Sequence, residues 1–117
     1  MRCDIGELIA KEFLLSKDFK SVDMTGYECD EGKADALCID ESGCHVLVNV
    51  ETHRKRGVEE PKQVYNVKRM RRVLMCYLAD HPEVKAARYD HILTTIYTGN
   101  GAEVAYTPPR SARHGGN

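Results

Sequence analysis

Four residues whose types could do chemistry lie on the two arms of one predicted β-hairpin: a base, an acid, an amide and a second acid. They are Lys33, Asp35, Asn49 and Glu51. Carboxylate and amide oxygens are ligands for hard divalent cations, and the apolar strands around them would leave these groups partly buried. Because partly buried charges persist only when they are paired, metal-bound or functional, this group requires an explanation.

The hairpin that carries these residues closes through a short loop in which Gly43 supplies the positive φ of a tight turn. Its arms alternate apolar and polar residues, as expected for strands with one buried face. With the arms paired across this loop, Asp35 lies opposite Asn49, and Lys33 lies opposite Glu51. Side chains two apart share a face of a strand, so all four are predicted to meet on one face.

The remaining pattern predicts one α/β domain over residues 1–109, with a mixed sheet flanked by helices in the order αβββαββ. The expected helices span 4–16 and 62–79, and the expected strands span 19–28, 34–40, 45–52, 88–97 and 102–107. The polar segment 53–61 is expected to be a mobile loop. The tail 110–117 has nothing to bury and is expected to be disordered.

The composition predicts a cytoplasmic globular protein without a membrane segment. Of the 117 residues, 42% are hydrophobic and 30% are charged, which is enough apolar content for a modest core. No stretch is long and apolar enough to span a membrane, and the N-terminus lacks the pattern of a secretory signal. Five cysteines without close spacing predict free thiols rather than disulfides.

The net charge of −1 conceals two halves of opposite sign. Residues 1–51 hold twelve acids and five Lys or Arg, whereas residues 52–117 hold twelve Lys or Arg and six acids. Much of this positive charge falls in one stretch, at Arg54, Lys55, Arg56, Lys68, Arg69, Arg71 and Arg72. Nucleic-acid phosphates are the natural partner of such a density. A solvated helix face is the alternative explanation.

Several short motifs stand in a recognisable order from about Gly6 to about Ile96. They are Gly6-Glu7 with Ala10 and Phe13-Leu14, then Gly32-Lys33-Ala34-Asp35, then Val46 to Thr52, then Arg71-Arg72 with Tyr77-Leu78 and His81-Pro82, and finally Arg88-Tyr89-Asp90. In this order and spacing the chain resembles the YraN family of small bacterial proteins. That family has the restriction-endonuclease-like core of the PD-(D/E)XK nuclease superfamily, so the resemblance implies the same core here.

The resemblance also implies a metal-dependent nuclease site. In such a site carboxylates hold Mg²⁺ or Mn²⁺, which polarises the phosphoryl group, and a lysine lies near the attacking water. The resemblance directs catalytic roles to Glu7, Lys33, Asp35 and Glu51, and metal ligation to Asp35, Asn49 and Glu51. For Glu7, a simple favourable interaction with the positive end of its helix is the alternative explanation.

The departures from the family pattern fall on this chemistry. Relatives typically read Gly-Glu-Ile-Asp at positions 32–35, so Lys33 replaces a glutamate. They read Glu-Val-Lys at 49–51, so Asn49 replaces a carboxylate and Glu51 replaces a lysine. The glutamate–lysine pair of the family therefore has its members exchanged, which keeps a cross-strand attraction of roughly 0.2–1 kcal/mol.

Two interpretations of this site remain open, beside a purely structural one. In an active site, Glu51 supplies the second negative charge and Lys33 takes over the role of the lysine. In a weakened site, Lys33 neutralises Glu51, Asp35 alone cannot hold a metal, and the protein has no cofactor. We favour the weakened site because a lysine opposite a ligand competes for its charge. His53, next to this group, is a further candidate base or ligand, whereas His91 looks like an ordinary strand residue.

Three functions follow from these observations. The first is a nucleic-acid-binding protein, with DNA favoured over RNA, whose centre is altered and inactive. The second is an active Mg²⁺-dependent endonuclease that hydrolyses phosphodiester bonds. The third is an interaction domain whose basic helix binds an acidic protein partner. A homodimer is compatible with each, and a membrane partner is not expected.

Overall fold

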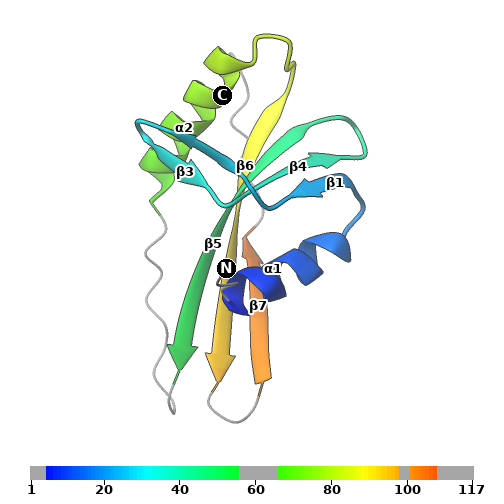
Figure 1. Cartoon of the computed structure of the whole chain (residues 1–117), viewed down its shortest axis with the longest axis vertical. Helices are drawn as coiled ribbons and strands as arrows, with labels where there is room; N and C mark the ends of the chain where they lie inside the picture. The colour runs from blue at the N-terminus through cyan, green and yellow to red at the C-terminus, as the bar shows by residue number, and fades with distance from the viewer. Residues whose placement is uncertain (1–4, 56–65, 98–100, 108–117) are drawn as a thin grey trace.

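The fold is built on one mixed β-sheet, described for residues 5–55, 66–97 and 101–107 of the computed structural model. Its elements are α1 (Ile5–Leu15), β1 (Phe19–Asp23), β2 (Tyr27–Cys29), β3 (Gly32–Ala34), β4 (Ala36–Asp40), β5 (His45–Lys55), α2 (Val67–Asp80), β6 (Ala87–Tyr97) and β7 (Gly101–Thr107). In the described residues the main sheet has five strands in the order β1-β4-β5-β6-β7 (Figure 1). Only the β5–β6 pair in this sheet is parallel, and α2 lies in the connection between these two strands.

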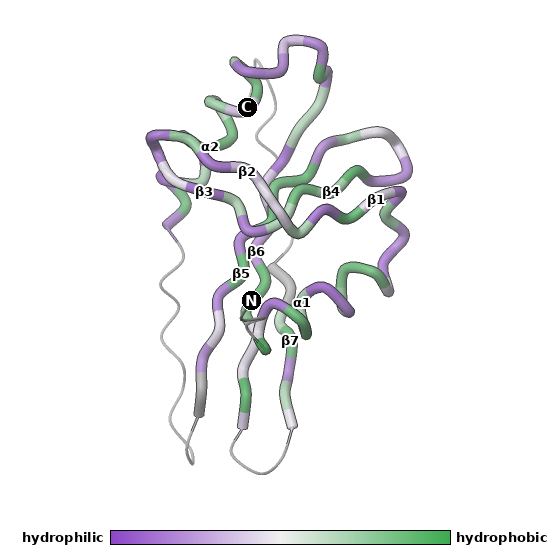
Figure 2. Tube along the Cα trace, viewed as in Figure 1, coloured by the Kyte–Doolittle hydropathy of each residue, from purple (hydrophilic) through white to green (hydrophobic). Residues whose placement is uncertain are grey.

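The two helices cover opposite faces of the sheet, and each face has its own apolar cluster. Ala10 and Leu14 of α1 pack with even-numbered strand residues such as Val48. Leu74 of α2 packs with odd-numbered residues such as Leu47. Successive side chains of a strand point to opposite faces, so the continuous apolar run in β5 serves both clusters. Figure 2 shows hydrophobic residues where β4, β5 and β6 meet, and mainly hydrophilic residues along the C-terminal half of β5.

The predicted hairpin and its register are confirmed for the arms next to the turn. Ala36 pairs with Val48, and Ile39 pairs with His45. The backbone N–H of Gly43 donates to the Asp40 carbonyl at 3.0 Å, with Gly43 at φ 91° as the turn requires. The four candidate residues lie farther from the turn. There the predicted pairing of Lys33 with Glu51 is wrong, because Lys33 pairs with Glu28.

The chain leaves the sheet at Asp35, and this adds a hairpin that the predicted order lacks. The Asp35 carboxylate accepts the backbone N–H of Val50 at 2.7 Å, so a side chain takes the place of a strand carbonyl at this point. Residues 27–29 and 32–34 form a separate two-stranded hairpin, β2–β3, which packs against α2 (Figure 1). The predicted strand 19–28 is therefore two strands, and the described chain has two more strands than the predicted order.

Other boundaries also differ from the prediction. β5 continues to Lys55, because it stays in parallel register with β6 up to the pair Lys55 and Tyr97, whereas a loop was expected from residue 53. α2 begins at Val67 after Asn66, whose side-chain oxygen accepts the backbone N–H of Arg69 at 3.0 Å. The expected helical start at 62–65 and the tail 110–117 lie outside the described residues. Neither described helix has the length and apolar content to cross a membrane.

Arg88 joins the hairpin turn to β6 through two carboxylates. Its guanidinium lies 2.8 Å from Asp40 Oδ2 and 3.2 Å from Oδ1 of the buried Asp90. Burial raises the pKa of Asp40, but hydrogen bonds from Ser42 and Cys44, together with the charge of Arg88, outweigh it. The pKa of Asp40 is consequently lower than its usual value, so the folded protein favours the ionised carboxylate.

We expect the Asp40 contribution to stability to disappear on acidification. Because the folded-state pKa is depressed, this contribution is complete above the unfolded pKa of about 3.9 and is lost as pH falls through the folded-state value. Urea unfolding between about pH 6 and about pH 2 measures the effect. Asp40→Asn should be less stable than the wild type near neutral pH and should approach it at the acid end. A constant difference across the range would contradict this assignment.

The turn after β1 requires glycine at position 26. Gly26 has φ 69°, and a Cβ at this position would lie 2.1 Å from the Ala34 carbonyl oxygen. Gly26→Ala is expected to lower the free energy of unfolding by roughly 2–4 kcal/mol, because backbone strain and steric overlap add. Gly43→Ala is the matched control: its φ is also positive, but a Cβ there meets no atom within 4 Å. Its expected loss is about 1 kcal/mol, and equal losses in the two variants would contradict the packing of this turn.

Candidate functional site

The polar residues of the candidate site lie on the α2 face of β5. Leu47 on this face is buried against α2, and the next residues of the same face are Asn49, Glu51 and His53, which are half-buried. β6 contributes His91, whose exposed fraction is 1% and which is the register partner of Asn49. We call Asp35, Asn49, Glu51, His53 and His91 the polar cluster.

Side-chain contacts within the polar cluster centre on Glu51 and His91. Glu51 Oε2 lies 2.5 Å from His53 Nε2, and Glu51 Oε1 lies 3.3 Å from His91 Nε2. On the other side of the imidazole, Asn49 Nδ2 lies 3.1 Å from His91 Nδ1. An amide nitrogen can only donate, so Nδ1 accepts and the proton of a neutral His91 resides on Nε2, toward Glu51.

Burial determines the charge of His91. It lowers the pKa of the imidazole more strongly than the carboxylates of Glu51 and Asp35 raise it. The pKa of His91 therefore lies below its usual value, and the ring is neutral at pH 7. The neutral imidazole accepts a hydrogen bond from Asn49 and presents its other nitrogen to the Glu51 carboxylate. The sequence indicated only a strand residue here, because the partnership with Asn49 depends on the parallel register of two distant strands.

Lys33 does not lie opposite Glu51, so the predicted exchanged pair is not formed. Lys33 belongs to β3, where its register partner is Glu28. Its Nζ lies 3.6 Å from Asp35 Oδ1, and its side chain is 68% exposed. An ion pair that is this solvated contributes little to stability. Glu51 is bound by histidines instead, because the departure of the chain at Asp35 carries Lys33 out of the sheet.

Glu7 lies on α1, which covers the face of the sheet opposite to the polar cluster. It is exposed in the first turn of α1, where Gly6 packs so closely on Thr52 that a Cβ would lie 1.9 Å from Thr52 Oγ1. Thr52 and Glu51 are successive residues of β5, so their side chains point to opposite faces. The structure thus brings Asp35, Asn49 and Glu51 to one cluster and leaves the helix of Glu7 behind the sheet.

The oxygens of the polar cluster do not fit a Mg²⁺ site in this arrangement. Mg²⁺ requires several oxygen ligands in octahedral geometry. Both oxygens of Asp35 have protein partners, the Val50 N–H and Lys33, and both oxygens of Glu51 contact histidines. Across the described part of the chain, no three His, Cys, Asp or Glu side chains are arranged to hold a metal ion. Hydrogen bonds and ion-pair contacts therefore engage the oxygens that metal ligation would use.

A small cavity adjoins the polar cluster at the start of α2. Its volume is about 160 Å³, and Lys33, Asn49, Asn66, Arg69 and Met70 line it. Two cationic side chains and the positive end of the α2 dipole converge there, while the carboxylates of the cluster lie on neighbouring positions. The two cations and the helix dipole favour an anion that also accepts hydrogen bonds, against the repulsion of the neighbouring carboxylates.

The predicted basic residues of α2 lie on the exposed side of the helix, and Arg69 among them lines this cavity. Lys68, Arg69, Arg71 and Arg72 are all exposed. Arg72 forms an ion pair with Glu31, with Nε 3.0 Å from Oε1. Of the other predicted basic residues, the side chains of Arg54 and Lys55 and the whole of Arg56 lie outside the described part of the chain. The exposed face of α2 is thus strongly cationic over its first two turns.

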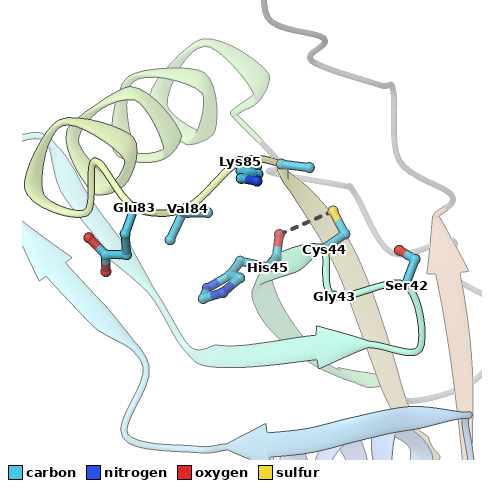
Figure 3. Close-up of a pocket in the computed structure, with 8 residues that line it drawn as sticks. Ser42, Gly43, Cys44, His45, Glu83, Val84 and Lys85 are labelled. Atoms are coloured by element: carbon cyan, nitrogen blue, oxygen red, sulfur yellow. Dashed lines mark hydrogen bonds between the residues drawn. The ribbon is translucent and has the colours of Figure 1, made fainter.

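A larger cavity of about 370 Å³ lies where the β4–β5 turn meets the connection from α2 to β6 (Figure 3). Cys44 and His45 line it, but neither is poised for nucleophilic chemistry. Burial raises the pKa of the Cys44 thiol, which therefore stays protonated, and its Sγ lies 3.6 Å from the His45 carbonyl. His45 Nδ1 is held 2.6 Å from the hydroxyl of Tyr77.

Comparison with known proteins adds no assignment: no protein-family model and no curated protein matches this chain. The resemblance to the YraN family therefore stays a prediction from the sequence. The functional argument has to stand on the polar cluster, the cavity beside it and the basic face of α2.

We expect Asp35 to act on the backbone rather than through a metal. Asp35→Ala leaves the half-buried N–H of Val50 without its acceptor and should lower the free energy of unfolding by about 1–3 kcal/mol. Asp35→Asn keeps an acceptor oxygen and should lose less. Thermal unfolding with and without millimolar Mg²⁺ or Mn²⁺ is the measurement, and the wild-type Tm should not change. A metal-dependent rise in Tm that Asp35→Ala removes would show that the carboxylate binds the ion.

Proposed function

We propose that this chain is a nucleic-acid-binding protein of the restriction-endonuclease-like class with an altered, inactive centre. DNA is the preferred partner in this proposal. The phosphate backbone lies along the first turns of α2, and one phosphate occupies the cavity between Lys33 and Arg69. The single observation that carries the proposal is the convergence of exposed cations on a small cavity at a helix start.

Charge favours a phosphate over other anions at this position. Lys33 and Arg69 come from different elements, so a ligand between them is contacted from two sides. Arginine presents several donors in a fixed planar arrangement that matches phosphate oxygens. Lys68 and Arg71 extend the positive surface along the helix, as required for a repeating backbone rather than a single ion.

The order of elements within the main sheet also supports the class. Without the β2–β3 hairpin, the described elements run helix, three strands, helix, two strands, which is the order that the family resemblance implies. In a nuclease of that class, the carboxylates nearest this position would hold a metal ion. Here Asn49 supplies an uncharged amide, and Glu51 is bound by His53 and His91. Binding without hydrolysis is the function that this arrangement supports best.

An active Mg²⁺-dependent endonuclease is the second candidate. The observation in its favour is that Asp35 and Glu51 both lie close enough to His91 for their charges to raise its pKa. Two carboxylates on one face are the minimum that such chemistry needs. For this candidate, Asp35 would have to release Val50 and Lys33, and Glu51 would have to release the histidines, before either could bind the ion.

Salt-dependent binding tests the proposal. In fluorescence anisotropy with duplex, single-stranded and branched DNA and with RNA, affinity should fall linearly on a double-logarithmic salt plot, with a slope of about −0.7 to −0.9 per phosphate contacted. Lys33→Gln and Arg69→Gln should each weaken binding roughly tenfold and reduce the size of the slope by about 1. Lys11→Gln is the matched control, because it removes the same charge from the exposed side of α1.

Three results would contradict the proposal. Equal losses in Arg69→Gln and Lys11→Gln would mean that binding is not located on the α2 side. Binding of an acidic polypeptide with higher affinity than DNA would favour the protein-interaction alternative. Mg²⁺- or Mn²⁺-dependent cleavage that Asp35→Ala abolishes and Asn49→Glu increases would replace the proposal with the active endonuclease.

A further inference from the structure

Side-chain contacts tie the β2–β3 hairpin to α2 at two places. The Tyr27 hydroxyl lies 2.6 Å from Asp80 Oδ2 near the end of the helix. Arg72 Nε lies 3.0 Å from Glu31 Oε1 two turns earlier. The hairpin and the helix thus run alongside each other, in opposite directions, between these two contacts. Residues between these contacts that share a face with the contacting residues point toward the other element.

Cys29 and Cys76 occupy those midway positions. Cys29 is two residues from Tyr27 on β2, so the two share a face of the strand, and Glu31 follows in the turn between β2 and β3. Cys76 is four residues from both helix partners, and residues four apart share a helix face. Cys29 also packs against the apolar cluster that α2 covers. The two thiols consequently face each other across the contact between hairpin and helix.

Electrostatics agree with this placement. A hydrogen bond with the Cys29 sulfur raises the pKa of the Cys76 thiol, with a further rise from burial. Both side chains are half-buried and carry free thiols. Cys38 differs, since it is fully buried, and burial raises its pKa to about 12. Cys44 lines the larger cavity instead. Among the described cysteines, Cys29 and Cys76 are thus brought together by the fold.

We propose that Cys29 and Cys76 are a redox-active thiol pair that a small disulfide oxidant, such as oxidised glutathione, converts into an intramolecular disulfide. One protein thiolate attacks the oxidant and releases the first glutathione thiol. The second protein sulfur then attacks the mixed disulfide and releases the second. Two electrons pass to the oxidant, one S–S bond is broken and one is formed, and the two thiol protons end on the released glutathione.

The disulfide would fasten the hairpin that carries Lys33 to the helix that carries Arg69. These two residues line the same cavity from different elements, so the bond would hold their separation constant. This consequence for phosphate binding rests on the proposed function, whereas the disulfide itself does not. Oxidation would therefore act on the site without touching any residue that contacts the ligand.

Oxidation of the full chain tests the pair directly. The protein is incubated in glutathione buffers of increasing oxidised fraction, free thiols are blocked with N-ethylmaleimide, and peptide mapping by mass spectrometry locates the remaining disulfide. The expected product is a monomer with Cys29 joined to Cys76. Its Tm should be higher by roughly 5–15 °C than that of the reduced protein, because the bond closes a long loop in the unfolded chain.

Variants separate this inference from other outcomes. Cys29→Ser and Cys76→Ser should each remain folded and lose both the disulfide and the rise in Tm. Cys44→Ser, the matched control, should keep both. Complete alkylation of Cys29 and Cys76 under oxidising buffer, or a disulfide to another cysteine or another molecule, would overturn the inference. That failure leaves the proposed function untouched, whereas absence of nucleic-acid binding in both redox states overturns the proposed function and leaves the disulfide standing.

Discussion

Parallel pairing of β5 with β6 is the constraint on which the rest of the structure depends. The register runs without a break from His45 with Ala87 to Lys55 with Tyr97. Parallel strands cannot be joined by a tight turn, so the connecting chain must cross over the sheet and provides α2 on one face. Because the paired strands are apolar on both sides, the other face must be covered too, and α1 does so. The long central strands, the two helices and the two apolar clusters all follow from this pairing.

The same pairing explains why a polar cluster can exist inside the sheet. It aligns Asn49 with His91, so an amide from one strand and an imidazole from the other satisfy each other. Glu51 then has two histidines within reach rather than a lysine or a metal ion. Buried polar groups are tolerated when they find partners, and the partner of His91 Nδ1 comes from a strand that is distant in sequence. Lowering the charge of the centre in this way is consistent with a site that binds a polyanion without cleaving it.

The β2–β3 hairpin lines the cavity opposite α2, because it carries Lys33. Its path away from the sheet depends on Asp35, whose carboxylate replaces a backbone acceptor for Val50. Once outside the sheet, the hairpin packs along α2 and brings Lys33 to the cavity at the start of that helix. The cysteines that face each other lie along the same contact. The proposed phosphate binding and the proposed thiol oxidation would therefore both involve this one small element and its packing on α2.

Local patterns allowed a substantial part of this molecule to be predicted. Alternation around Gly43 indicated the hairpin and its register, because pairing next to a tight turn depends on neighbouring residues alone. Periodicity indicated both helices, and the charge density indicated the exposed basic face of α2. Residue types likewise drew attention to Asp35, Asn49 and Glu51, which do share one cluster. These features are local, so the sequence by itself determined them.

The partners of those residues were decided only by the tertiary structure. A hairpin pattern gives no sign that a side chain will replace a backbone acceptor, so the separation of Lys33 from Glu51 could not be foreseen. The role of His91 depends on a parallel register between strands that a helix separates in sequence. The approach of Cys29 to Cys76 depends on how one element packs along another. In each case the interaction joins segments that are distant in sequence, and its geometry exists only when the whole sheet and its helices are assembled.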